Sequence, residues 1–157
     1  MKTLLKFTSL LAVVAGILMI AGGAWAINFT YENVSRENII TPSDASIPNT
    51  IVRGPLTLKS QADIIRAHAL RSAGGQTYAE MPRQIPKIDQ KGDPILDGEG
   101  NIIMVANEAR NTWVTATVLI TALNLGIVTY LFSGLIVLLG LISVWTGLIF
   151  YTISKKT

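Results

Sequence analysis

The sequence contains no cysteine and only one histidine, His68, in 157 residues. A chain without cysteine forms no disulfide bond, whatever compartment it enters. One histidine is also too few for a zinc site with several His or Cys ligands, or for an iron site with two histidines and a carboxylate. Glycine-rich nucleotide fingerprints, phosphate loops and the Gly-x-Ser-x-Gly elbow of hydrolases are missing as well. We therefore expect no enzyme active site, no cofactor and no metal ion.

Charge is missing from two long stretches of the chain. The first, Phe7–Ile27, is long enough as a helix to cross a hydrocarbon core of roughly 30 Å. The second, Trp113–Ile153, would measure about 60 Å as one helix, roughly twice that thickness. We divide it at Tyr130–Gly134, where serine and glycine favour a turn, into the spans Trp113–Leu131 and Gly134–Ile153. A re-entrant or interfacial hairpin is the alternative.

These stretches define the predicted organisation. The fold class is an integral membrane protein with three α-helical spans and a small α+β extracytoplasmic domain between spans one and two. Residues 1–27 form the amino-terminal anchor, 28–112 the domain, 113–153 a transmembrane helical hairpin and 154–157 a short polar tail. The net charge of +3 is too small and too scattered to indicate nucleic-acid binding.

The amino-terminal stretch has a second interpretation, as a cleaved signal peptide. A basic start precedes the apolar run, and Ala24–Ala26 has the small-x-small form of a cleavage site, which would leave a mature chain beginning at Ile27. The uncharged run is longer than the apolar region of most signal peptides. We favour a retained anchor on this ground.

The terminal lysines predict the orientation. Lys2 and Lys6 precede the first span, so the positive-inside rule places the amino terminus in the cytoplasm and the 28–112 domain on the other side of the membrane. With three spans the carboxyl terminus would also lie outside. That placement of Lys155 and Lys156 conflicts with the same rule, and the side of the carboxyl terminus stays open.

Within the 28–112 domain, the strings ENIITP and NTIVRGPLTL predict two short extended segments. Ser60–Gly75 is predicted to be a helix. Ser60 and Asp63 resemble a capping box at its start, and Gly74-Gly75 would end it. Asp93–Val105 has apolar runs on both sides of a glycine-rich turn and predicts a hairpin. The string NEARNTW is predicted to continue as helix into the second span.

The candidate ligand or structural motif consists of His68, Thr77, Tyr78 and Glu80. His68 would share a helix face with Arg71, and no carboxylate within helical reach orients it, so we favour a structural role. Thr77, Tyr78 and Glu80 follow the glycine stop. They would dock the turn back onto the domain or, in the alternative, bind a ligand.

A calcium loop is a further candidate. Asp97, Glu99, Asn101 and Glu108 occupy positions 1, 3, 5 and 12 of the EF-hand spacing. Position 6 is Ile102, where the sharp loop turn needs glycine, and Ile102 begins an apparent strand. We favour a plain hairpin turn.

Small residues in the spans predict helix packing. Each span has one small-xxx-small pair, which lets two helices approach closely; the pairs are Ala12/Gly16, Ala122/Gly126 and Ser143/Gly147. Asn124 is the one strongly polar side chain inside a span, and we expect it to form a hydrogen bond with another helix of this protein or of a partner.

A set of residues between one amino-terminal span and a carboxy-terminal apolar hairpin follows the pattern Gly54-Pro55, Gln61-Ala62, Ile65, His68, Gly75, Thr77-Tyr78-Ala79-Glu80. The pattern resembles a family of small bacterial membrane proteins that often carry the label aromatic ring-opening dioxygenase. The resemblance covers most of the chain and implies a three-span membrane protein. One histidine does not supply the iron site that the label implies. The segment Lys87–Asn101 departs from the family pattern.

We therefore expect a non-enzymatic accessory or structural subunit of a membrane or cell-envelope complex. Its partners would be the lipid bilayer and either other membrane subunits or further copies of itself. The alternative is an extracytoplasmic ligand-binding or sensing module that uses His68, Tyr78 and Glu80.

Overall fold

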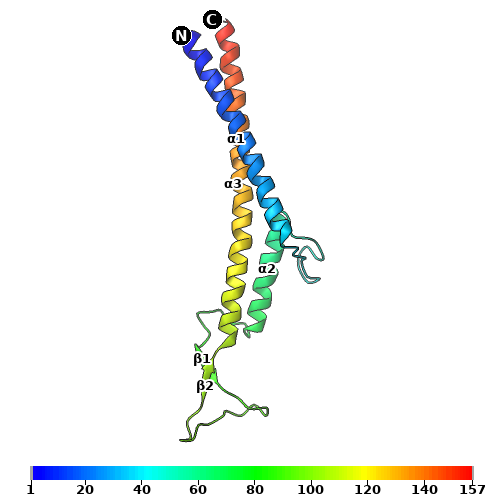
Figure 1. The fold of residues 1–157 in the computed structure, drawn as a ribbon, viewed down its shortest axis with the longest axis vertical. Coiled ribbons are helices and arrows are strands. Elements are labelled where there is room, and N and C mark those ends of the chain that lie inside the picture. Colours follow the sequence, from blue (N-terminus) through cyan, green and yellow to red (C-terminus); the bar gives the residue numbers. More distant parts are fainter. Residues whose placement is uncertain (1, 157) are drawn as a thin grey trace.

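The computed structural model of the chain describes residues 2–156, which form three helices and a minimal sheet. The elements, in chain order, are α1 (Lys2–Arg36), α2 (Pro55–Ser72), β1 (Gln84–Pro86), β2 (Met104–Ala106) and α3 (Glu108–Lys156). α1 lies antiparallel to the carboxy-terminal half of α3, so both ends of the chain lie at the same end of the molecule (Figure 1). α2 lies beside the other half of α3, and residues 84–106, from β1 to β2, form an arm beyond it (Figure 1).

α3 is one helix of 49 residues and runs without a break through Tyr130–Gly134, where a turn was predicted. The helix contains no proline. Ser133 is buried, and its carbonyl oxygen faces Gly23 of α1, so the small residue at this position serves helix packing. The prediction of three spans is therefore wrong, because the chain has two long apolar helices.

The contact between α1 and α3 follows a seven-residue repeat. At every seventh position along each helix a small residue is buried, and we call this set the glycine seam; its members are Ser9, Gly16, Gly23 and Thr30 of α1, and Ser133, Gly140, Gly147 and Ser154 of α3. A strict seven-residue repeat keeps such a seam facing its partner along a left-handed supercoil. The repeat explains why the two helices stay in contact over most of α1.

Branched side chains of one helix fill the spaces left by glycines of the other. A Cβ atom added to Gly16 would lie 2.6 Å from the carbonyl oxygen of Gly140 and 2.7 Å from the side chain of Val144. In the opposite direction, a Cβ atom on Gly140 would lie 2.8 Å from Ile20. The two backbones approach so closely that any side chain at these glycines would overlap the partner helix.

The small α+β domain predicted for residues 28–112 is absent from the described structure. α1 continues to Arg36, and the regular sheet is limited to β1 and β2, which pair antiparallel over three residues each. An isolated bridge between Ile40 and Ile51 joins the two segments that were predicted to be extended. Strand residues of the arm are exposed, so the arm has too little buried apolar surface for a core of its own.

The apolar core of this region lies instead where the end of α1, the following loop, α2 and α3 meet. Its buried members are Val52, Leu58, Ala62 and Leu123. A Cβ atom on Gly126 would lie 3.2 Å from Leu58, so this glycine makes room for α2 on α3.

The helix predicted over Ser60–Gly75 is present but begins earlier, at Pro55. Gly54 is the N-cap residue, and Pro55 fits the first helical turn because its fixed φ suits a helix and no amide hydrogen is needed there. Ser60 lies inside α2, where its hydroxyl accepts a hydrogen bond from the Ile47 amide at 2.9 Å. The stop at Gly74-Gly75 is as predicted, since both glycines have positive φ just after the helix ends.

We predict that Gly16→Ala destabilises the hairpin of α1 and α3 by about 1–3 kcal/mol, because the added methyl group overlaps backbone. Gly22→Ala is the matched control: no atom lies within 4 Å of its Cβ position, so alanine should be neutral or stabilise α1 by up to about 1 kcal/mol. Thermal unfolding of both variants in the same detergent gives the comparison. Equal midpoints for the two variants would contradict the packing described.

Candidate functional site

His68 forms an exposed cluster with Asp44 and Arg71. Nε2 of His68 lies 2.8 Å from Oδ2 of Asp44, and the guanidinium of Arg71 donates to the same oxygen at 3.0 Å. Asp44 belongs to the loop after α1, whereas His68 and Arg71 are three residues apart on α2. The cluster therefore ties the loop to the helix.

The charges of this cluster keep Asp44 ionised. The hydrogen bond from His68, and then the one from Arg71, lowers the pKa of Asp44 below its ordinary value of 3.8. A carboxylate that orients a histidine is one part of an acid–base site, but the carboxylate here is shared with Arg71. The nearby hydroxyl of Ser72 donates to the backbone carbonyl of His68 at 2.9 Å. These contacts join the loop and α2, and they include no activated nucleophile among the described residues.

Thr77, Tyr78 and Glu80 form a closed turn after α2. The amide and the hydroxyl of Thr77 both donate to Oε2 of Glu80, at 2.7 and 2.8 Å, and these bonds lower the pKa of Glu80. Arg110 of α3 stacks over the Tyr78 ring, 3.8 Å from its centroid, and donates to the carbonyl oxygens of Tyr78 and Met81. The turn is thereby docked on the first turn of α3.

The structure separates His68 from this turn. His68 lines a shallow hollow between α2 and α3 of about 240 Å³, whereas Tyr78 lines a different hollow of about 290 Å³ with Trp113 of α3. Glu80 is engaged with Thr77. A larger apolar hollow of about 550 Å³ lies where α1, α2 and α3 meet, and the side-chain oxygen of Gln61 beside it is buried without a hydrogen bond from the described residues.

The acidic residues of the arm shape its turns. Oδ1 of Asp97 accepts the amides of Asn101 and Glu99, both at 2.9 Å, and the first of these bonds contributes most to a lowered pKa of Asp97. Asp89 accepts the amides of Lys91 and Asp93 in the same way. Within residues 2–156, no group of three or more His, Asp or Glu side chains is arranged to hold a metal ion.

The candidate packing residues lie along α1 and α3. Gly16 and Gly147 belong to the glycine seam, and the hydroxyl of Ser143 donates to the carbonyl oxygen of Ala12 at 2.9 Å. Gly126 contacts Leu58 of α2. Asn124 is exposed on α3, and its side-chain amide forms no hydrogen bond with the residues that the structure describes.

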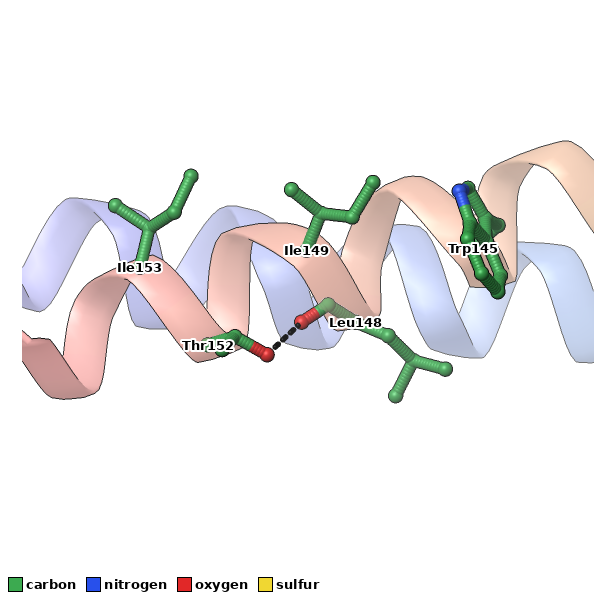
Figure 2. A pocket seen from close by; sticks show the side chains of 5 residues that line it. All are labelled: Trp145, Leu148, Ile149, Thr152 and Ile153. Carbon is green, nitrogen blue, oxygen red and sulfur yellow. Dashed lines mark hydrogen bonds between the residues drawn. The ribbon is translucent and has the colours of Figure 1, made fainter.

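The outer surface of α3 is largely apolar near its carboxyl end. Figure 2 shows a hollow lined by Trp145, Leu148, Ile149, Thr152 and Ile153, all from this one helix. Its one hydroxyl, that of Thr152, donates to the carbonyl oxygen of Leu148 at 2.8 Å (Figure 2). Trp145 is 69% exposed. Such a surface suits lipid or another apolar helix.

Sequence reasoning missed two residues of these clusters. Asp44 lies 24 positions from His68, so a search for a carboxylate within helical reach does not find it. Arg110 lies 32 positions from Tyr78. Neither pairing has a local spacing that would indicate it, because both depend on how the helices pack.

No protein-family model, no curated protein and no solved structure matches this chain. The resemblance to the small bacterial membrane proteins that carry the dioxygenase label therefore stays a prediction.

We predict that Asp44→Asn raises the hydrogen-exchange rate of the Ile47 amide by about two- to fivefold, because an exposed ion pair that fastens the loop is lost. Asp63→Asn is the control: Asp63 pairs with Lys59 inside α2, so its loss should leave the Ile47 amide unchanged. Equal effects of the two variants would contradict the role of Asp44.

The same loop should loosen in acid. Because the pKa of Asp44 is lowered in the folded chain, the stability that its ionised form contributes is present above its ordinary value of 3.8 and is lost as the pH falls through the lowered value. Exchange of the Ile47 amide, corrected for its intrinsic pH dependence, should accelerate in that acid window and show no such step in Asp44→Asn.

Proposed function

We propose that the chain is a non-enzymatic membrane protein that crosses the bilayer twice and acts as an accessory or structural subunit of a membrane or cell-envelope complex. One observation carries the proposal. Two helices are long and apolar enough to span a membrane, yet only 11% of the most apolar window of each is buried within the chain. Apolar helices that leave most of their surface uncovered need an apolar environment, which a bilayer or a partner supplies.

The paired parts of α1 and α3 define the level of the bilayer. α1 carries no charge between Lys6 and Glu32, and the part of α3 that faces this run extends from the region of Tyr130 to its end. Tyr130 and Tyr151 stand about 30 Å apart along the helix, which matches the core thickness and the usual place of interfacial aromatic residues. Both rings would lie near the headgroups.

The remaining part of α3 lies outside the bilayer in this arrangement. α2 packs beside it through Leu58 and Ile65, and α2 has charged side chains on its exposed face, among them Lys59, Asp63 and Arg66. Charged side chains at that level are costly in lipid. The bilayer therefore ends where α2 begins to contact α3, close to Gly126.

The orientation then agrees with every terminal lysine. Both chain ends lie at one end of the hairpin (Figure 1), so Lys2, Lys6, Lys155 and Lys156 share one side of the bilayer. The positive-inside rule makes this side cytoplasmic and places the loop, α2 and the arm outside. The conflict that three spans created for Lys155 and Lys156 does not arise with two.

The outer part supports a role in contact rather than catalysis. His68, Asp44 and Arg71 fasten the loop to α2, and Arg110 fastens the turn at Tyr78 to α3. The arm beyond α2 is exposed except at Ile95 and Ile103, which are half-buried, and it is held by short pairings. A braced outer segment on a membrane hairpin offers a surface for a partner.

We predict the following labelling pattern for single cysteines, which the native chain does not contain. In spheroplasts, an impermeant thiol reagent should label Ser43→Cys, whereas Thr3→Cys and Thr157→Cys should react only after lysis. Labelling of Thr3→Cys before lysis would refute the orientation. If Thr157→Cys reacted before lysis and Thr3→Cys did not, the two-span hairpin would be refuted. Release of the protein by alkaline carbonate would refute membrane insertion itself.

A further inference from the structure

We propose that a hollow between α1 and α3, at the lysine-bearing end of the hairpin, binds one anionic phospholipid. The hollow measures about 400 Å³. We call it the lysine hollow, and its lining includes Lys6, Leu10 and Val13 of α1 and Leu148, Tyr151 and Lys155 of α3. The inference rests on the proposed function, because it requires both helices to lie in a bilayer, and it names the class of lipid that the chain binds there.

The part of the lysine hollow nearer the bilayer centre is apolar. Leu10 and Leu148 are 63% and 51% exposed on either side of it. Ser9 also lines the hollow, but its hydroxyl donates to the carbonyl oxygen of Gly147 at 2.8 Å. In the proposed arrangement this part lies inward of Tyr151, at the level of the acyl chains. A hollow of this size and lining suits the upper part of an acyl chain.

Two ammonium groups meet at the outer part of the hollow. Side chains of a helix lean toward its amino terminus. Lys6 of α1 therefore extends away from the bilayer centre, whereas Lys155 of the antiparallel α3 extends toward it. The Lys155 ammonium accordingly lies 4.7 Å from the centroid of the Tyr151 ring, one turn back along α3. The two lysines thus line one hollow although their backbones stand at different levels of the hairpin.

The charge at this end of the molecule has one sign. Neither residues 2–31 nor residues 109–156 contain an Asp or a Glu. α2 and the arm, where acidic side chains occur, lie beside and beyond the opposite half of α3 (Figure 1). The described side chains therefore provide no anion for Lys6 and Lys155. The phosphate of a lipid supplies one, and lysines are common phosphate ligands.

The same charges favour an anionic lipid over a zwitterionic one. A choline or ethanolamine headgroup would bring its own cation beside Lys6 and Lys155, which repel it. One face of the Tyr151 ring, a surface to which a choline cation could bind, is already covered by Lys155. Basic pockets between membrane helices on the cytoplasmic side are known to bind anionic headgroups. The lysine hollow adds an apolar part in the position where the acyl chain of such a lipid begins.

Native mass spectrometry of the full chain, titrated in detergent with phosphatidylglycerol or phosphatidylcholine, tests the site. We expect one phosphatidylglycerol to be retained, with an apparent affinity about tenfold above that of phosphatidylcholine. The double variant Lys6→Gln/Lys155→Gln should lower the affinity for phosphatidylglycerol by about tenfold. Both lysines are exposed, so neither exchange removes a buried contact.

Lys2→Gln/Lys156→Gln is the matched control. It removes the same charge from the same end of the chain, but Lys2 and Lys156 do not line the hollow. The affinity for phosphatidylglycerol should stay within about twofold of the unmodified chain. Equal weakening by the two double variants would show a diffuse attraction to the charged end and overturn the site. Equal retention of the two lipids by the unmodified chain would also overturn it.

Two further arms identify the source of the phosphate and the cause of a failure. Inorganic phosphate, compared with chloride at equal ionic strength, should not displace phosphatidylglycerol, because it leaves the apolar part of the hollow empty. Displacement by phosphate would overturn the assignment of a lipid. Carbonate extraction of native membranes separates this failure from failure of the proposed function. A chain that stays in the pellet without preferring phosphatidylglycerol is a membrane protein that lacks the site, whereas a released chain refutes the proposed function itself.

Discussion

The close approach of α1 and α3 at the glycine seam is the contact on which the rest of the structure depends. Small residues recur at every seventh position of both helices, and the branched side chains Val13 and Val144 fit over glycines of the partner. Two apolar helices gain little from the hydrophobic effect inside lipid, so their association there relies on packing of this kind and on hydrogen bonds. Ser9 and Ser143 add such bonds, to the carbonyl oxygens of Gly147 and Ala12.

The difference in length between α1 and α3 determines where α2 packs. α1 has 35 residues and α3 has 49, so α3 extends past the point where α1 ends. α2 occupies the free side of this extension, with Leu58 seated at Gly126. One helix therefore supports both the proposed membrane hairpin and the outer segment.

Much of the local structure was open to prediction from sequence. The apolar ends, the stop at Gly74-Gly75 and the helix that begins near Glu108 each have a local cause in hydropathy, backbone freedom or capping. The break at Tyr130–Gly134 was predicted wrongly, because a small residue such as serine favours a turn and also allows close helix packing, and Ser133 packs against Gly23 of α1. Local sequence does not distinguish these two uses. Gly23 on the partner helix, which faces Ser133, decides between them.

The candidate site was less accessible to such reasoning. His68, Thr77, Tyr78 and Glu80 were identified, yet their partners Asp44 and Arg110 come from distant parts of the chain. The start of α2 was misplaced because Ser60 resembles a capping residue, whereas its hydroxyl holds the preceding loop at Ile47. In each case a polar residue with a familiar local role is used for a contact that only the packed helices create.

The most direct test of the hairpin is the distance between the two chain ends, measured by pulsed electron paramagnetic resonance on spin labels at Lys2→Cys and Lys156→Cys in lipid nanodiscs. Labelled chains diluted into unlabelled ones would remove signals between copies. The hairpin predicts one population of distances well below about 30 Å, because α1 and α3 end on the same side of the bilayer. Distances of about 30 Å or more would place the ends on opposite sides and contradict the continuous α3 and its glycine seam.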